Sequence, residues 1–381
     1  MKTKVYSSSK NIFIDALKEL KNQIEKDFEK IDFLLFALPP KFGKDVPKKI
    51  ETIFQNIDYA GFHAISAFKD DSITEDSVTV AVFQFKKRAK VKKFYIEDIR
   101  NFEKDNTIEK TANFLNNNKN SIHIILAGLA EEKFALFLEK LSSCINYNHI
   151  DNIVGGISSG EVIDEELKTW QFIDGKTIKN GFIIISFENI KAKIGISLGF
   201  KPYGITYKIT KAKDSKIYEV DNGVNFTEVA KRLLRGIENP DFRYLWFLPL
   251  NILDETDGYV STLRTIEKVN SEYVKLFGPV KKGQYFKLSF ATEDDIIEED
   301  KNVAKKIKAE INPEIIFNFS CVAREYILGD RKEEEIKTYV DIFKTPAFGF
   351  FTFGEIGPDK YFKKLKLYNE TSLLIGLKEN D

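Results

Sequence analysis

The stretch Gly349-Phe-Phe-Thr-Phe-Gly-Glu-Ile356 carries the pattern on which the fold prediction depends. Its aromatic run is typical of a strand, and a Gly-Glu pair follows the run. Two earlier stretches have a similar form, Gly61-Phe-His-Ala-Ile-Ser-Ala-Phe68 and Gly155-Gly-Ile-Ser-Ser-Gly-Glu-Val162. We therefore expect an internal repeat.

Each copy of this stretch lies in the same order of expected elements. A continuous apolar run predicts a buried strand, helically spaced apolar residues predict a helix, the glycine stretch follows, and another strand ends the unit. This order occurs over residues 33–85, 122–188 and 314–377. The first glycines are 94 and 194 residues apart, so the second interval leaves room for a further, more loosely matching unit within residues 205–290. We predict an α+β protein of internally duplicated β-α-β-β units, whose mixed sheets are backed by helices.

The composition limits the class of protein and its partners. The 381 residues are 43% hydrophobic and 30% charged, which is typical of a globular protein. Lys plus Arg and Asp plus Glu are balanced at 58 each, so no net charge attracts nucleic acid or an anionic membrane. The N-terminus has no signal-peptide apolar region, and no apolar run approaches the roughly 18 residues of a membrane span. We expect a cytoplasmic protein with neither nucleic acid nor membrane as partner.

Few residues could bind a metal or a cofactor. The two cysteines, Cys144 and Cys321, are 177 residues apart and form no CxxC motif, which argues against a disulfide framework or a thiolate zinc site. The three histidines are His63, His123 and His149, and the first two lie within apolar strands, where a core histidine is the usual role. We predict no metal and no cofactor.

An acyl-transfer enzyme is one alternative. Gly156-Ile-Ser158-Ser-Gly160 satisfies the G-x-S-x-G pattern of a nucleophile elbow, but all three histidines precede the serine, whereas hydrolases of that class place theirs after it. Cys321 follows an apolar strand and is a second candidate nucleophile. Glu161 stands where a phosphate-binding loop has lysine, which disfavours nucleotide hydrolysis. We predict that the protein is not an enzyme.

Polar side chains in the C-terminal quarter follow expected strands. Cys321, Arg324 and Glu355 fall at the ends of neighbouring strands, where α/β architectures usually bind ligands. Arginine offers a planar fork to a carboxylate, and glutamate accepts an ammonium group. We predict a pocket for an amino acid or another small carboxylate, with a purely structural Arg324–Glu355 ion pair as the alternative.

Several motifs, in order along the chain, resemble the FIST family, a sensory module with a FIST-N and a FIST-C half. They are Gly156-Ile-Ser158-Ser159-Gly160-Glu161, Lys201-Pro-Tyr-Gly204, Thr210, Glu219-Val-Asp-Asn-Gly223, Thr262-Leu-Arg264, Phe319-Ser-Cys321-Val-Ala-Arg324, Gly349-Phe-Phe-Thr352-Phe-Gly354-Glu355-Ile-Gly-Pro358 and Asn369-Glu-Thr371. The resemblance implies a FIST-N-like half at residues 1–200 and a FIST-C-like half at residues 201–381.

The resemblance also implies a function. We expect a stand-alone, non-catalytic small-molecule sensor in signal transduction, whose output passes through a separate protein such as a histidine kinase. Some relatives bind haem and sense nitric oxide, so a haem-binding nitric-oxide sensor acting on a histidine kinase is a second alternative. The ligand-binding residues that we expect are Arg264, Cys321, Arg324, Gly349, Thr352, Gly354, Glu355 and Asn369, with Ser158, Ser159, Gly160 and Glu161 in the first half.

Overall fold

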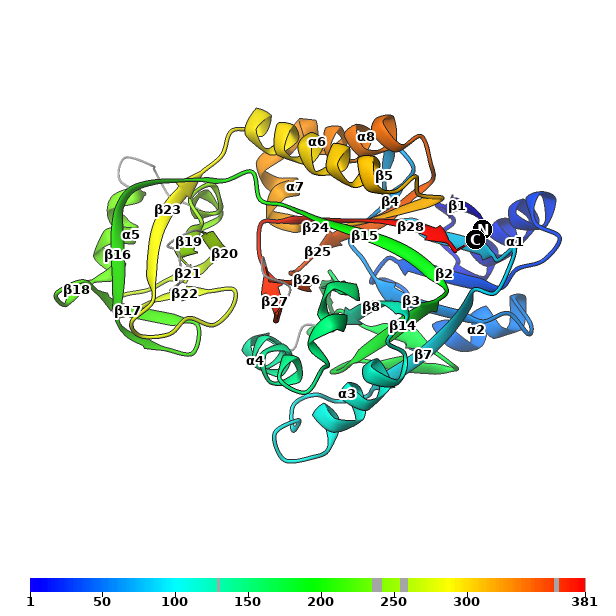
Figure 1. The fold of residues 1–381 in the computed structure, drawn as a ribbon, viewed down its shortest axis with the longest axis horizontal. Helices are drawn as coiled ribbons and strands as arrows, with labels where there is room; N and C mark the ends of the chain where they lie inside the picture. The colour runs from blue at the N-terminus through cyan, green and yellow to red at the C-terminus, as the bar shows by residue number, and fades with distance from the viewer. Residues whose placement is uncertain (129–130, 235–241, 254–259, 360–362, 381) are drawn as a thin grey trace.

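Three six-stranded sheets form the main body of the computed structural model, which describes residues 1–128, 131–234, 242–253, 260–359 and 363–380 (Figure 1). The first sheet has the order β1 (Lys2–Ser8), β6 (Val78–Gln84), β2 (Phe33–Leu38), β3 (Tyr59–His63), β12 (Gln171–Ile173), β13 (Lys176–Ile178). The second has the order β7 (Lys90–Ile96), β14 (Phe182–Glu188), β8 (Ser121–Ala127), β9 (Ile153–Ile157), β26 (Glu355–Pro358), β27 (Leu365–Tyr368). The third has the order β15 (Ile190–Ser197), β28 (Ser372–Glu379), β24 (Ile315–Cys321), β25 (Ala347–Thr352), β4 (Ser66–Lys69), β5 (Ser72–Glu75).

The first four strands of every sheet follow one design. Two antiparallel pairings lead to a parallel pair, which is β2–β3 in the first sheet, β8–β9 in the second and β24–β25 in the third. Between the two strands of each parallel pair the chain forms a helix, α2 (Val46–Ile53), α4 (Glu131–Ser142) or α8 (Lys332–Phe343). The predicted duplication of units with mixed sheets is confirmed.

The last two strands of each sheet come from a different unit. The hairpin β12–β13 follows β9 in the chain but pairs with β3, and β26–β27 follows β25 but pairs with β9. In the same way β4–β5 follows β3 and pairs with β25. The exchange is therefore cyclic, and strands from both sides of residue 200 share the second and third sheets.

The inner faces of the three sheets share one apolar core. Its buried side chains include Phe33 of the first sheet, Ile185 of the second and Phe317 of the third. Helices bury the outer faces: α1 (Phe13–Asp27) and α2 cover the first sheet, α3 (Thr107–Asn117) and α4 the second, and α6 (Glu293–Glu310) and α8 the third. Each sheet is thus apolar on both faces, as its continuous hydrophobic strands predict.

The repeated glycines occupy equivalent positions in the parallel pairs. Gly155 lies opposite Ile125 and Gly349 opposite Asn318, and Gly61 has the matching place in the first unit. A Cβ atom added at Gly155 or Gly349 would lie 1.8 or 1.9 Å from the carbonyl oxygen of the opposite residue. Only glycine allows this close approach of two backbones.

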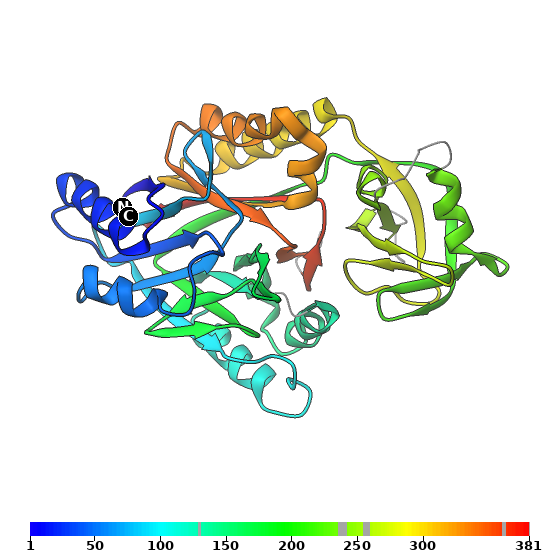
Figure 2. The same cartoon turned by 180° about the vertical axis from the view of Figure 1, so that it is seen from behind.

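Residues 201–290 form a β-rich insertion between β15 and α6, and the further β-α-β-β unit expected in this region is wrong (Figures 1 and 2). The insertion contains α5 (Phe226–Leu233), β16 (Lys201–Lys213), β17 (Lys216–Val220), β18 (Val224–Asn225), β19 (Leu250–Leu253), β20 (Val260–Arg264), β21 (Ile266–Val269), β22 (Val274–Leu276) and β23 (Tyr285–Phe290). All pairings among its described strands are antiparallel, and it has a core of its own. The 194-residue interval therefore contains one inserted segment rather than another copy.

The repeated glycine can be tested by adding one methyl group. Gly349→Ala should lower the free energy of unfolding by about 1–3 kcal/mol or more, because the new methyl group meets a backbone carbonyl that cannot move alone. Gly43→Ala is the control, since nothing lies within 4 Å of a Cβ atom built there. Urea denaturation midpoints measure both effects, and equal midpoints for the two variants would contradict the assigned role.

Candidate functional site

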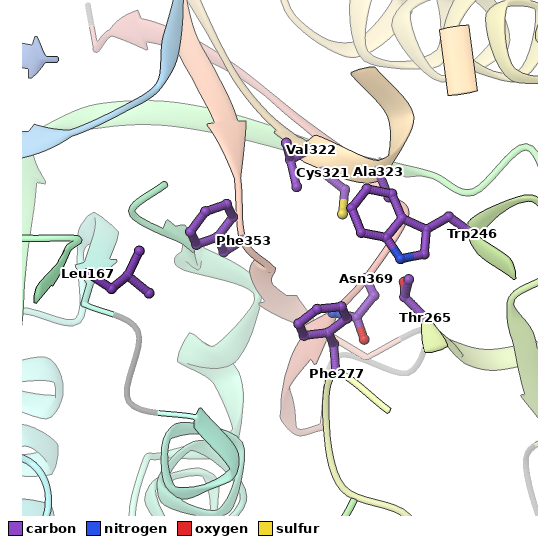
Figure 3. A pocket seen from close by; sticks show the side chains of 9 residues that line it. All are labelled: Leu167, Trp246, Thr265, Phe277, Cys321, Val322, Ala323, Phe353 and Asn369. Carbon is purple, nitrogen blue, oxygen red and sulfur yellow. The ribbon is translucent and has the colours of Figure 1, made fainter. Parts of the chain in front are cut away.

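A pocket of about 270 Å³ lies where the β-rich insertion meets the strand ends of the main body (Figure 3). We call it the junction pocket. The insertion contributes Trp246, Thr265 and Phe277, and the main body contributes Leu167, Cys321, Val322, Ala323, Phe353 and Asn369. Six of these nine side chains are apolar, so the pocket offers a mainly hydrophobic surface.

Strand topology explains why main-body residues meet there. Cys321 ends β24, and Phe353 follows its parallel neighbour β25, so the two residues lie at the same edge of the third sheet. Asn369 directly follows β27. Of the five residues predicted to meet at strand ends, Cys321 and Asn369 share this lining, whereas Arg264, Arg324 and Glu355 are not part of it, and a ligand-binding role for any of them stays a prediction.

Asn369 is the polar residue of the pocket with an unused group. Its side chain is 3% exposed, and its Oδ1 atom has no hydrogen-bond partner among the described residues. Thr265 differs, because its hydroxyl donates to Oε1 of Glu370 over 2.8 Å. Burying an acceptor without a partner is costly, so Oδ1 of Asn369 is a natural contact for a ligand donor.

Arg324 does not pair with Glu355, so the alternative of a purely structural ion pair between them is wrong. Arg324 is fully buried, and its Nη2 donates to both carboxylate oxygens of Asp300 over 2.8 and 2.7 Å. Its Nε donates to Glu335 over 3.2 Å. Glu335 also accepts hydrogen bonds from Asn318 and Ser320 in the same described network. The fork that we expected to hold a ligand carboxylate therefore holds two carboxylates of α6 and α8.

Glu355 lies behind the junction pocket rather than in its lining. It is fully buried and accepts hydrogen bonds from the hydroxyls of Thr352 and Thr371. Burial raises the pKa of Glu355 to about 8, so its carboxyl group is mainly protonated at neutral pH. Gly354 directly precedes β26, and its carbonyl accepts from the amide of Ile157 over 2.8 Å, which extends the pairing of β26 with β9.

The four ligand-binding residues predicted in the N-terminal half follow β9 and lie outside the junction pocket. Ser158 is fully buried and accepts a hydrogen bond from Gln171, and Ser159 accepts one from the amide of Ile65. Gly160 packs against the main chain, because a Cβ atom there would lie 1.9 Å from the carbonyl oxygen of Lys168. Glu161, in β10 (Glu161–Ile163), is exposed. None of these four residues lines the junction pocket, and their ligand-binding role stays a prediction.

Arg264 lies at the same junction but lines a neighbouring cavity. Its Nη1 donates to the carbonyl oxygen of Leu367 over 2.9 Å, which connects the insertion to β27.

Sequence reasoning missed the apolar residues of the junction pocket, above all Leu167, Trp246 and Phe277. No pattern marks them, because each belongs to a segment that meets the pocket only through tertiary packing.

The candidate nucleophiles Ser158 and Cys321 and the candidate haem ligands His63 and His123 are buried. Burial raises the pKa of Cys321 well above its ordinary value, an effect to which the nearby Glu355 and Glu370 add. His63 contacts the carbonyl oxygens of Phe42 and Lys168, and burial lowers its pKa to about 4, so the imidazole is neutral. His123 contacts Ser186 over 2.7 Å. The side chain of His149 lies outside the described residues.

Two family models match the chain, the FIST N domain over residues 32–223 and the FIST C domain over residues 227–358. The chain belongs to the FIST family. FIST domains are sensory domains of signal transduction. A similar protein of Aquifex aeolicus (strain VF5), described as an uncharacterized protein, is 32% identical over 264 residues, which are 68% of this chain and 97% of the relative. Across the described parts of this FIST protein, no helix is both long enough and apolar enough to cross a membrane.

The two cysteines should differ in reactivity. Cys144 is exposed, whereas Cys321 is buried with a raised pKa and is therefore almost wholly a thiol at pH 7.5. Iodoacetamide should label Cys144 at least ~10-fold faster, because only the thiolate reacts readily. Peptide mass spectrometry after timed labelling measures both rates in one sample. Faster labelling of Cys321 would instead support the acyl-transfer alternative.

Removal of Arg324 should destabilise the FIST fold. Arg324→Ala leaves Asp300 and Glu335 buried without their cation, so the free energy of unfolding should fall by about 3–5 kcal/mol. Arg331→Ala is the control, because its ion pairs with Glu293 and Glu334 are partly exposed and screened by water, so their loss should change the stability far less. Chemical denaturation compares the two, and a native-like Arg324→Ala protein would argue against the structural role.

Proposed function

We propose that this FIST protein is a non-catalytic sensor that binds a small, largely apolar molecule in the junction pocket. The main support is the lining itself, in which six apolar side chains line the pocket together with Asn369, whose Oδ1 atom has no hydrogen-bond partner among the described residues. A concave, mainly apolar surface with a few fixed polar atoms is typical of small-molecule sites. Membership of the FIST family supports the sensory role, and the geometry of the lining supports the junction pocket as the binding site.

The same lining supports a particular class of ligand. No Lys or Arg side chain is among the residues that line the pocket in the described part of the chain. The acceptor of Asn369 calls for a ligand donor, and Trp246, Phe277 and Phe353 suit an aromatic or branched apolar body. We infer that the ligand is an apolar amine, a class that includes apolar amino acids bound through their amine group. Arg324 is not assigned to bind a carboxylate of this ligand.

The position of the pocket supports a signalling mechanism. The ligand would contact Trp246 and Phe277 of the insertion and Cys321 and Phe353 of the main body at once. Binding therefore favours one arrangement of the two parts over others, and a separate cytoplasmic protein such as a histidine kinase would detect that arrangement. The hydrogen bond from Thr265 to Glu370 already crosses the same junction over 2.8 Å.

The pocket chemistry supports binding rather than turnover. Cys321 is a buried thiol whose raised pKa disfavours the nucleophilic thiolate. His63 and His123 already contact polar groups of the protein, so the haem alternative has no specific observation in its favour.

A thermal-shift series with matched probes tests the ligand class. Phenylethylamine and L-phenylalanine at millimolar concentration should raise the melting temperature, whereas phenylacetate, which lacks the amine, should not. A probe at 100 times its Kd stabilises the folded state by about 2.7 kcal/mol. Asn369→Ala should abolish the shift, and Asn120→Ala, at an exposed turn, should retain it.

Two outcomes would count against the proposal. A rise in melting temperature with phenylacetate alone would show that the ligand binds through a carboxylate and not through an amine. Equal shifts of the melting temperature in wild type and in the Asn369→Ala variant would show that the probe binds outside the junction pocket.

A further inference from the structure

A second cavity, of about 430 Å³, lies on the other side of the insertion's contact with β27. We call it the Arg264 pocket. Its polar lining comes from the insertion and from the main body, and includes Glu139, Thr262, Arg264, Lys281, Gln284 and Lys364. Arg264 and Thr265 are adjacent in the chain, yet Arg264 lines this cavity and Thr265 lines the junction pocket.

Arg264 is buried, and none of the described residues gives it an anionic partner. It is 7% exposed, and its hydrogen bonds to the described residues all end on neutral acceptors. Nη1 donates to the hydroxyl of Thr262 and to the carbonyl oxygens of Leu263 and Leu367, and Nε donates to the carbonyl oxygen of Pro279. No carboxylate of the described residues accepts a hydrogen bond from it. Burial lowers the pKa of Arg264 to about 10, so its guanidinium remains charged at neutral pH.

The buried arginines of this protein therefore contrast sharply. Arg324 is neutralised by Asp300 and Glu335, which is the usual condition for a buried charge. Arg264 has no such compensation from the part of the chain that the structure describes, although a buried unpaired charge is expensive. The missing partner is explained if a ligand supplies the negative charge.

The rest of the lining also has an excess of positive charge. Lys281, Lys364 and Lys366 line the cavity together with Arg264, and among the described residues of the lining Glu139 is the one that carries a carboxylate. Glu139 pairs with Lys281 over 2.8 Å. The side chains of the Arg264 pocket thus carry a net positive charge, although the protein as a whole has a formal net charge of zero.

We propose that the Arg264 pocket binds the oxyanion group, a carboxylate or a phosphate, of a small organic molecule. Guanidinium offers several donors in a fixed plane, which matches the oxygens of both groups. Lys281 and Lys364 add charge from opposite sides of the junction, one from the insertion and one from the main body. Ile252, Leu253 and Leu365 give the organic part of the ligand an apolar wall.

Titration calorimetry with inorganic phosphate and with malonate tests this site at constant ionic strength. Wild-type protein should bind at least one of them saturably. Arg264→Gln should weaken that affinity by about tenfold or more, and Lys281→Gln by a smaller factor, because it removes a more exposed charge. Arg232→Gln is the matched control, since Arg232 is an exposed arginine of α5 outside the cavity and should leave the affinity unchanged.

Arg264→Lys covers the case in which Arg264→Gln fails to fold, because it retains the charge and loses the fork; it should still weaken binding several-fold. Binding of phosphate alone supports a phosphate ester as ligand, and binding of malonate alone supports a carboxylate. Absence of saturable binding for both anions overturns the proposal, as does unchanged affinity in the Arg264→Lys and Lys281→Gln variants. The thermal shift with amines, which depends on Asn369, tests the junction pocket separately. A negative result for one of the two pockets therefore does not affect the assignment of the other.

Discussion

The exchange of hairpins among the three units is the constraint on which the rest of the structure depends. No sheet is completed by its own unit, because β3, β9 and β25 each pair with a hairpin that follows another unit's parallel pair. The shared core needs all three inner faces, and the N-terminal amine bonds Glu314 and Glu379 of the last unit over 2.7 and 2.9 Å. Both chain ends consequently lie together (Figures 1 and 2). Such long-range pairing predicts slow, cooperative folding of the main body as one piece.

Much of this architecture could be predicted from the sequence because the repeat combines several independent signals. Buried strands are continuous apolar runs, helices have their own period, and Gly155 and Gly349 mark a backbone contact that excludes every other residue. The insertion was misinterpreted because its length is close to one repeat period. The hairpin exchange could not be predicted, since a hairpin's sequence does not specify which sheet it joins.

The site was predicted in part, for equally physical reasons. Parallel strands end at a common edge, so the prediction for Cys321 and Asn369 needed only the strand boundaries. The ion-pair partners of Arg324 could not be predicted, because they lie on α6 and α8, where acidic residues usually face solvent. Nothing in the sequence pattern marks Asp300 and Glu335 as buried. Among the described residues, charge compensation around an arginine therefore distinguishes a structural cation from a candidate ligand contact better than its position in a motif does.

The two ends of the insertion are neighbours, since Lys201 at the start of β16 pairs with Phe290 at the end of β23. A segment whose ends meet can be gained, lost or exchanged during evolution without breaking the sheet that it interrupts. The threefold body is then a frame that does not depend on the insertion for its sheets, and the insertion is a separate module that supplies Trp246, Thr265 and Phe277. Ligand preference within such a lineage would change by divergence of this module, while the strand-end residues that face it stay the same.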